Sequence, residues 1–168
     1  MTHLVLVGMM GVGKSTVGRI VASELGRPLY DSDDMIEQRT GRTVREIWAS
    51  DGERAFRELE SETLVEALAA IEPSVIAAAG GVVLSETNRD ALAASDAHVI
   101  WLHADIDLLL TRVRNGAHRP LLDGDPGGTL RRLYAERAPL YQEVADAVVL
   151  VDQRSPNEVA KAVLRCCA

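Results

Sequence analysis

The residues whose types and spacing best suit a chemical role lie in a glycine-rich run near the N-terminus. Residues 8–15 read G-M-M-G-V-G-K-S and match the pattern G-x-x-x-x-G-K-[ST] in full. In this pattern the backbone N–H groups surround a phosphate chain, the lysine reaches its β- and γ-phosphates, and the hydroxyl that follows binds Mg²⁺. The apolar run 4–7 comes before the glycines, and a helical pattern comes after them, which is the order strand, loop, helix that a phosphate-binding loop needs. The residues assigned to this site are Gly11, Val12, Gly13, Lys14, Ser15 and Thr16.

A chance glycine turn between a strand and a helix is the alternative reading of this run. The presence of both Lys14 and Ser15 at the required positions favours phosphate binding over chance. We therefore predict that the protein binds a nucleoside triphosphate together with Mg²⁺, with Ser15 as one metal ligand.

Two aspartates follow the second predicted strand. In open α/β sheets ligands bind beyond the carboxyl ends of the strands, and alternation along a strand would put Asp31 and Asp33 on one side. There they could hold Mg²⁺ through water, accept a hydrogen bond from a substrate hydroxyl, or take its proton. The alternative is that Asp33 or Asp34 only caps the next helix.

Three arginines in separate segments could meet in one pocket. Arginine is suited to two-pronged recognition of carboxylate or phosphate, and Arg57, Arg119 and Arg137 are the candidates. Arg57 and Glu60 are three residues apart and share a helix face, a spacing that most often gives an exposed ion pair of small stabilising effect.

Small residues close the third predicted strand. Gly80 and Gly81 would let another group come close to the backbone, either through tight packing or as a small anionic substrate on their N–H groups. From spacing alone, Trp48 and Phe56 are expected to be core residues.

The apolar patterning predicts an α/β fold. Short apolar runs alternate with helical patterns, as in a parallel sheet covered on both faces. Thr43 with Glu46 and Ser155 with Glu158 form capping-box patterns, and Gly26 suits a helix end. The expected strands are 3–7, 28–31, 74–79, 98–102 and 147–151. The expected helices are 14–25, 33–39, 43–50, 52–70, 86–94, 105–114, 127–143 and 155–166.

One stretch lacks regular patterning. Residues 115–128 are rich in glycine and proline and include basic side chains. This composition fits a surface loop, or a mobile lid that excludes water during phosphoryl transfer.

Composition limits the classes of protein. The chain has 168 residues, 47% of them hydrophobic, and a net charge of −7, which fits one globular domain and argues against nucleic-acid binding. No apolar run approaches the roughly 20 residues of a membrane span, and no targeting pattern opens the sequence, so we expect a cytoplasmic protein without a membrane partner. Cys166 and Cys167 are adjacent, so we expect neither a disulfide nor a zinc site.

Taken together, these residues resemble the shikimate kinase family over nearly the whole chain. The motifs that carry the resemblance are the phosphate loop, Asp31-Ser32-Asp33, residues 36–42, Gly52-Glu53 with Phe56-Arg57, Gly80-Gly81, residues 119–122 and residues 137–141. The resemblance implies a three-layer P-loop fold of the nucleoside-monophosphate-kinase type, with a five-stranded parallel sheet in the order 2-3-1-4-5. It also implies a single domain over 1–168, a substrate-binding region at about 32–70 and a lid at about 113–126.

The implied reaction is transfer of the ATP γ-phosphoryl group to the 3-hydroxyl of shikimate, on the route to chorismate and the aromatic amino acids. By position in the family, Asp33 would hold the shikimate hydroxyls and is the candidate base, and Asp31 would support the Mg²⁺ water shell. Arg57 and Arg137 would clamp the shikimate carboxylate with the backbone of Gly80 and Gly81.

Other positions follow from the same resemblance. Arg119 in the lid would bridge the phosphates and the substrate, and Trp48 and Phe56 would lie beside the substrate ring. Arg112 and Arg154 would sandwich the adenine, with Pro156 nearby. The implied molecules are ATP, Mg²⁺ and shikimate, and we expect a monomer.

One position departs from the family pattern. Ala79 stands where the family usually has the first of three glycines. A positive φ there would cost alanine about 1 kcal/mol, whereas a last strand residue would tolerate it, and we expect the second case.

Two other functions fit the phosphate loop. A kinase of the same fold could act on gluconate or a nucleoside monophosphate, although the pair Arg57 and Arg137 favours an acceptor with a carboxylate. A nucleotide-dependent switch is the second alternative, but the chain has no Asn-Lys-x-Asp motif for guanine, and the paired aspartates favour catalysis.

Overall fold

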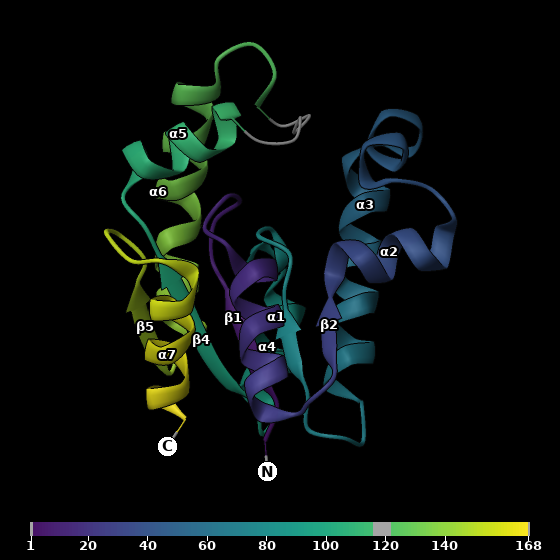
Figure 1. Ribbon diagram of the computed structural model, residues 1–168. Helices are drawn as coiled ribbons and strands as arrows, with labels where there is room; N and C mark the ends of the chain where they lie inside the picture. The colour runs from purple at the N-terminus through teal and green to yellow at the C-terminus, as the bar shows by residue number, and fades with distance from the viewer. Residues whose placement is uncertain (1, 116–121, 168) are drawn as a thin grey trace.

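A parallel sheet forms the centre of the molecule. The computed structural model describes residues 2–115 and 122–167. Its five strands lie in the order β2-β3-β1-β4-β5, and every neighbouring pair is parallel, so the expected fold class and strand order are confirmed (Figure 1). The strands are β1 (Leu4–Val7), β2 (Leu29–Asp31), β3 (Val75–Ala77), β4 (His98–His103) and β5 (Ala147–Leu150).

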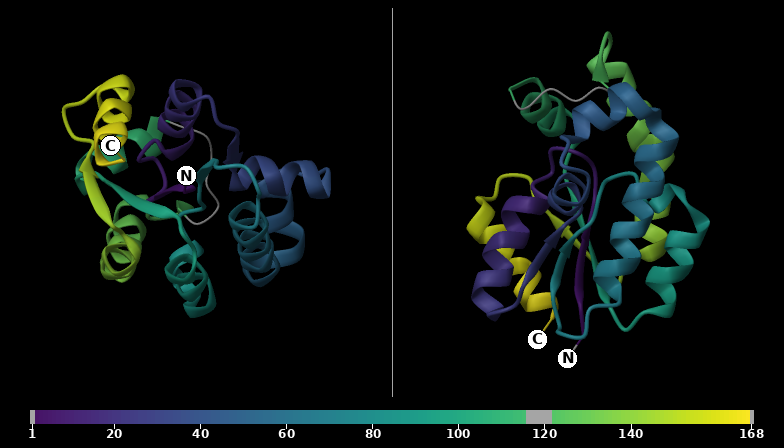
Figure 2. Two further views of the ribbon diagram at one scale, coloured as in Figure 1. Left: turned by 90° about the horizontal axis from the view of Figure 1, so that it is seen from below. Right: turned by 90° about the vertical axis from the view of Figure 1, so that its right-hand side faces the viewer.

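Helices cover both faces of this sheet. All four residues of β1 are buried, as a central strand with a helix layer on each side requires. Helices α1 and α7 pack together on one face, and α3, α4 and α6 lie on the other (Figure 2). The helices are α1 (Lys14–Leu25), α2 (Ser32–Thr40), α3 (Val44–Leu68), α4 (Glu86–Ala94), α5 (Ile106–Asn115), α6 (Pro126–Val144) and α7 (Pro156–Cys166).

The predicted helix starts and ends are confirmed where a cap was recognised. Thr43 and Ser155 each accept a hydrogen bond from the backbone N–H three residues on, and Glu46 and Glu158 return the bond. Gly26 ends α1 in the left-handed conformation, with φ of 60°. These caps fix where α1, α3 and α7 begin or end.

A non-helical glycine divides α3 where two helices were predicted. The expected helices at 43–50 and 52–70 correspond to the two parts of α3, which meet in a kink at Gly52, where φ is 83° and ψ is 177°. This backbone conformation is nearly exclusive to glycine, so Gly52 interrupts the helix and lets its second part begin at once. The kink sets the first turns of α3 at an angle to the rest.

The third strand is shorter than predicted. It ends at Ala77, and a 3₁₀ turn, η1 (Val82–Leu84), follows, so the expectation that Ala79 is the last strand residue was wrong. Gln153 is the one non-glycine residue with positive φ in the described ranges, so Ala79 carries no such strain. Its N–H donates to the Ser32 hydroxyl at 3.2 Å.

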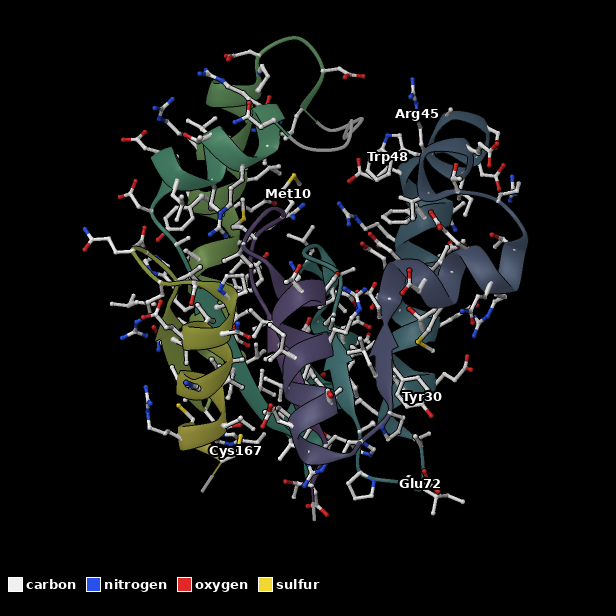
Figure 3. All side chains as sticks on the ribbon, in the orientation of Figure 1. Met10, Tyr30, Arg45, Trp48, Glu72 and Cys167 are labelled. Atoms are coloured by element: carbon white, nitrogen blue, oxygen red, sulfur yellow. The ribbon has the colours of Figure 1, made fainter. Side chains whose placement is uncertain are left out.

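The carboxyl ends of the strands all point to one end of the molecule. Figure 3 shows Met10, Arg45 and Trp48 toward that end, with Met10 across a gap from the other two, and Tyr30 and Glu72 toward the opposite end. The loops that follow β1 and β3 meet the start of α2 there, and a functional site is expected at such an edge. None of the described helices is long and apolar enough to cross a membrane.

Candidate active site

The loop between β1 and α1 has the shape of an anion cradle. Gly8, Gly11 and Gly13 have φ values of 148°, 79° and 105°, and a Cβ on Gly8 would lie only 2.5 Å from the Leu102 carbonyl oxygen. Helix α1 begins at Lys14, so its unpaired N-terminal N–H groups face the loop. A side chain at these positions would strain the backbone or clash with it, so the conformation of the loop requires glycine.

Lys14 lies folded over this loop. Its ammonium group donates to the carbonyl oxygens of Gly8 at 2.7 Å and Met9 at 3.1 Å. These bonds keep the positive charge beside the cradle, where a triphosphate would meet it.

Asp31 and Asp33 face one cavity, but not for the reason expected. Asp31 ends β2 and Asp33 lies in the first turn of α2, so strand alternation does not relate them and that argument was wrong. Asp31 caps α2, with Oδ1 accepting from the N–H groups of Asp33 and Asp34 at 3.1 and 3.5 Å. The cap is therefore Asp31, not Asp33 or Asp34, and it turns the chain so that both Asp31 and Asp33 line the cavity.

Arg57 is held from two sides in α3. Its guanidinium donates to the Glu60 carboxylate at 2.6 Å and to that of Glu53 at 3.3 Å. The guanidinium carbon also lies 5.6 Å from the Trp48 ring centre and 5.8 Å from that of Phe56. This arrangement orders a long side chain before any substrate binds.

Trp48 lies before the kink at Gly52 and Phe56 lies after it, and their rings contact each other. Their ring centres are 5.3 Å apart at 64°, an edge-to-face contact that aromatic rings favour. Phe56 packs in a small cluster with Ile36 and Ile47, so it is a core residue as its spacing suggested. Both rings also line the cavity.

The Arg57–Glu60 pair is not on the surface. Glu60 is only 3% exposed, which overturns the expectation of an exposed ion pair. Burial raises the pKa of Glu60, and the Arg57 charge opposes that rise. A buried carboxylate beside Arg57 fixes the guanidinium far more firmly than an exposed one would.

Arg137 approaches the same cavity from α6. It is 1% exposed, and its Nε has no hydrogen-bond partner among the described residues. A Cβ on Gly80 would lie 3.4 Å from an Arg137 nitrogen, and a Cβ on Gly81 would overlap the Arg57 guanidinium. The two glycines therefore allow both arginines to reach one place, which confirms that Arg57 and Arg137 converge.

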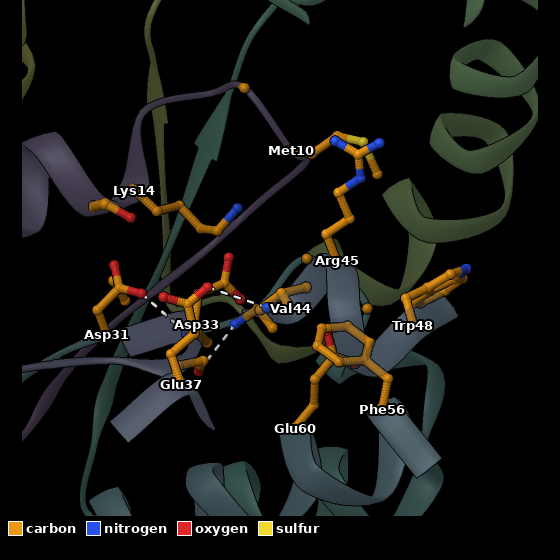
Figure 4. A pocket seen from close by; sticks show the side chains of 18 of the residues that line it. Met10, Lys14, Asp31, Asp33, Glu37, Val44, Arg45, Trp48, Phe56 and Glu60 are labelled. Atoms are coloured by element: carbon orange, nitrogen blue, oxygen red, sulfur yellow. Dashed lines mark hydrogen bonds between the residues drawn. The ribbon is translucent and has the colours of Figure 1, made fainter. Parts of the chain in front are cut away.

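These groups enclose a cavity of about 480 Å³. Figure 4 shows Lys14, Asp31 and Asp33 on one side of it, and Trp48 and Phe56 on the other. Its predicted lining residues are Gly11, Gly13, Lys14, Ser15, Thr16, Asp31, Asp33, Trp48, Phe56, Arg57, Gly80, Gly81 and Arg137.

A second cavity, of about 370 Å³, adjoins the loop on its far side. Gly11, Gly13 and Thr16 line both cavities. Arg112 donates to the carbonyl oxygens of Gly11 and Val12 at 3.3 and 3.0 Å. The other predicted residues that line it are Val12, Arg154 and Pro156.

Sequence reasoning missed part of the lining and could not place one residue. Met10, Glu37, Val44 and Arg45 line the first cavity, and nothing in their types or spacing identified them. Glu60 lines it as well, and the i, i+3 spacing with Arg57 was the available signal. Arg119, with positions 116–121 of the predicted lid, lies outside the described residues.

Comparisons with known proteins bear on this site. The family model for shikimate kinase matches residues 10–168. The shikimate kinase of Symbiobacterium thermophilum is 46% identical, covering 96% of this chain and 94% of its own. That of Pseudomonas aeruginosa strain LESB58 is 45% identical, covering 98% and 95%.

Solved structures agree. Shikimate kinase from Acinetobacter baumannii, solved in complex with shikimate, superposes with a TM-score of 0.94 at 36% identity, covering 99% of this chain and 93% of its own. A gluconokinase from Sinorhizobium meliloti reaches a TM-score of 0.56 at 21% identity and 98% and 93% coverage, which shows a shared fold alone. The phosphate cradle, the converging arginines and full-length similarity lead to one conclusion: the chain belongs to the shikimate kinase family, enzymes that phosphorylate shikimate at the expense of ATP.

Proposed function

We propose that the cavity lined by Asp33, Arg57 and Arg137 holds shikimate while the adjoining cavity holds the adenosine of ATP. The reaction is transfer of the γ-phosphoryl group to the 3-hydroxyl, giving shikimate 3-phosphate and ADP. The cavities share the phosphate loop, so a triphosphate lying along that loop would present its end to the first cavity.

Arg57 and Arg137 are the proposed clamp for the shikimate carboxylate. Two guanidinium groups converge where Gly80 and Gly81 expose backbone, and the buried Arg137 Nε lacks a partner in the described chain. A buried donor without a partner costs free energy. A carboxylate that accepts a hydrogen bond from it removes that cost and therefore binds more tightly. Trp48 and Phe56 would cover the ring.

Asp33 is proposed to receive the acceptor hydroxyl. Its place in the first turn of α2 sets its carboxylate in the cavity near Lys14. Phosphoryl transfer requires orientation and charge neutralisation more than covalent work, so Asp33 acts first by aligning the 3-hydroxyl. It is also the candidate to take the hydroxyl proton.

The nucleotide side follows the loop geometry. Lys14 and the loop N–H groups would neutralise the phosphates, and Arg112, Arg154 and Pro156 would enclose the adenine. Arg119 is proposed to bridge phosphates and substrate from a lid at about 113–126.

Mg²⁺ is the proposed cofactor. In the described ranges no three His, Cys, Asp or Glu side chains are grouped as a metal site. Mg²⁺ bound with a nucleotide keeps water and phosphate ligands and needs only one or two protein oxygens, which Ser15 and Asp31 provide from the same cavity wall. The ion would neutralise phosphate charge.

We further propose that residues 1–168 act as one kinase domain and as a monomer in the cytoplasm. One chain supplies every described group of both cavities, so no second copy is needed to complete the site.

The convergence of Arg57 and Arg137 on one cavity is the observation that carries this assignment. The test is ADP release from purified protein and MgATP, measured with shikimate, gluconate, a nucleoside monophosphate or no acceptor. We expect release that depends on shikimate, and nuclear magnetic resonance of the product should place phosphate at the 3-position. Equal release without acceptor would support a nucleotide switch, and release with another acceptor would support the rival kinase.

A further inference from the structure

A tyrosine outside the cavity lining is bonded to the substrate side of the site. Tyr141, in α6, is fully buried, and its hydroxyl donates to the Gly80 carbonyl oxygen at 2.6 Å. It lies one helical turn beyond Arg137, so both project from one face of α6. Its ring also packs against Trp101 of β4, with ring centres 5.8 Å apart.

This bond determines which way one peptide unit faces. The described chain contains no cis peptide bonds, and in a trans peptide the C=O and the following N–H point in opposite directions. Because Tyr141 holds the Gly80 carbonyl on the buried side, the Gly81 N–H must point away from Tyr141. Gly81 lines the cavity, so an N–H that points away from Tyr141 is free to serve that cavity.

The Gly81 N–H donates no hydrogen bond to any residue of the described ranges. Gly81 is buried, its carbonyl accepts from Leu84, and no hydrogen bond from its N–H is formed in the ranges described. Buried backbone donors are almost always satisfied. The Arg57 guanidinium lies against the same residue, so an anion placed there would meet both donors.

We propose that Tyr141 is a positioning residue for shikimate: its hydroxyl fixes the Gly80–Gly81 peptide so that the Gly81 N–H and Arg57 together receive the substrate carboxylate. This inference rests on the proposed function of the first cavity. Tyr141 itself does not touch the substrate, and it acts through the peptide that it orients.

The hydroxyl suits this role because it remains a donor. Burial raises the pKa of Tyr141 to about 12, and the charge of Arg137 and its hydrogen bond with the tyrosine side chain oppose the rise. The phenol therefore keeps its proton throughout the range in which a protein is assayed. Without the hydroxyl, the peptide could rotate and present its carbonyl to an anion, which would repel it.

The test is Tyr141→Phe, with Tyr134→Phe as the matched control. Tyr134 lies on the same helix, and its hydroxyl bonds to His103 Nε2 at 2.6 Å, so the control also removes one partly buried hydroxyl. For Tyr141→Phe we expect the KM and Kd for shikimate to rise about tenfold, the effect of one hydrogen bond to a charged group. The kcat and the KM for ATP should change less than about twofold, as should all constants of Tyr134→Phe.

A second substrate separates positioning from general loosening of the fold. In shikimyl alcohol a hydroxymethyl group replaces the carboxylate, so the kcat/KM of Tyr141→Phe with it should equal that of wild type. An equal loss with both substrates, or an equal loss in Tyr134→Phe, would overturn the proposal. If Tyr141→Phe is too unstable for kinetics, the urea midpoint with and without saturating shikimate replaces them: a ligand-induced increase equal to that of wild type overturns the proposal, and a smaller one supports it.

The same measurements distinguish failure of the proposed function from failure of the positioning role of Tyr141. In that case wild-type protein would show no shikimate-dependent ADP release, and Tyr141→Phe would have nothing to impair. A wild type that is active on shikimate, with an unaltered KM in Tyr141→Phe, would reject the positioning role alone.

Discussion

Replacing Lys14 should impair phosphate binding without unfolding the protein. Its ammonium group donates to two backbone carbonyl oxygens of the loop, and methionine keeps the length of the side chain, so Lys14→Met should leave the fold intact. We expect kcat to fall by about 100- to 1,000-fold, the usual effect of removing one group that stabilises transition-state charge. The measurement is steady-state ADP release together with circular dichroism.

The chain provides its own control for that variant. Lys161 is its only other lysine and lies exposed on α7, so Lys161→Met removes the same charge at a distance. It should retain wild-type kcat. Normal activity in Lys14→Met would refute the phosphate-loop assignment.

Arg57 should act on shikimate and not on ATP. We expect Arg57→Ala to raise the KM for shikimate by about 10- to 100-fold, as loss of a charged hydrogen bond predicts, with the KM for ATP nearly unchanged. The substitution also leaves Glu60 buried without its partner, which will lower stability. Arg57→Lys keeps a cation beside Glu60, so it should fold better and still bind shikimate more weakly than wild type.

Arg54→Ala is the matched control for Arg57. The Arg54 side chain is 94% exposed and pairs with Glu58 on the same helix, an interaction of little energetic effect. We expect its kinetic constants to match those of wild type. An Arg57→Ala enzyme with an unchanged shikimate KM would remove the clamp role.

The position of these side chains shows where reasoning from residues alone succeeds. The phosphate loop was predictable because its chemistry needs a fixed local spacing. The Arg57–Glu60 contact was predictable from helix geometry too. Its burial was not, because α3 packs against α4 and η1, which come from a later part of the chain. Met10 and Arg45 had no signal, since the cavity arises only where the β1–α1 loop and the start of α3 meet in the folded chain.

The kink in α3 is an element with a function of its own. Trp48 lies before Gly52, Phe56 and Arg57 lie after it, and the conformation at Gly52 favours glycine strongly. Gly52→Ala should therefore cost about 1–3 kcal/mol of unfolding free energy. Because the straightened helix would separate Trp48 from Phe56, the KM for shikimate should also rise. Urea denaturation and steady-state kinetics measure the two effects.

Gly26→Ala is the control that separates the loss of stability from the rise in the KM for shikimate. Gly26 also has positive φ, and a Cβ added there would meet no described atom within 4 Å, but it ends α1 far from the cavity. We expect a loss of about 1 kcal/mol and an unchanged KM. If Gly52→Ala also leaves the KM unchanged, the kink has a structural role only.

The elements themselves followed closely from local sequence. Helix bounds agreed with prediction wherever Thr43, Ser155 or Gly26 gave a cap, because capping depends on residues within one turn. The division of α3 at Gly52 was confirmed, because a glycine between two helical patterns can adopt the non-helical backbone conformation found there. β3 was predicted too long because Ala78 and Ala79 are as apolar as the strand, whereas the Ala79 N–H donates to the Ser32 hydroxyl and not to a neighbouring strand.

The arrangement of the whole molecule could not be derived from periodicity. Alternating strands and helices predict a parallel sheet, but the order β2-β3-β1-β4-β5 came from the family resemblance. Parallel strands separated by helices can be placed in several orders with the same local patterns. The meeting of Arg57 and Arg137 depends on that order, because it brings the ends of β1, β2 and β3 side by side.

Two adjoining cavities predict separable stabilisation by the two substrates. A ligand that binds only the folded state stabilises it by about 2.7 kcal/mol at 100 times its Kd, or about 5–10 °C in Tm for a chain of this length. MgADP and shikimate should each give such a shift in wild type. Lys14→Met should lose most of the MgADP shift and keep that of shikimate, whereas Arg57→Lys should do the reverse. Loss of both shifts in either variant would mean that the two cavities are not independent sites, since damage to one would then abolish binding at the other.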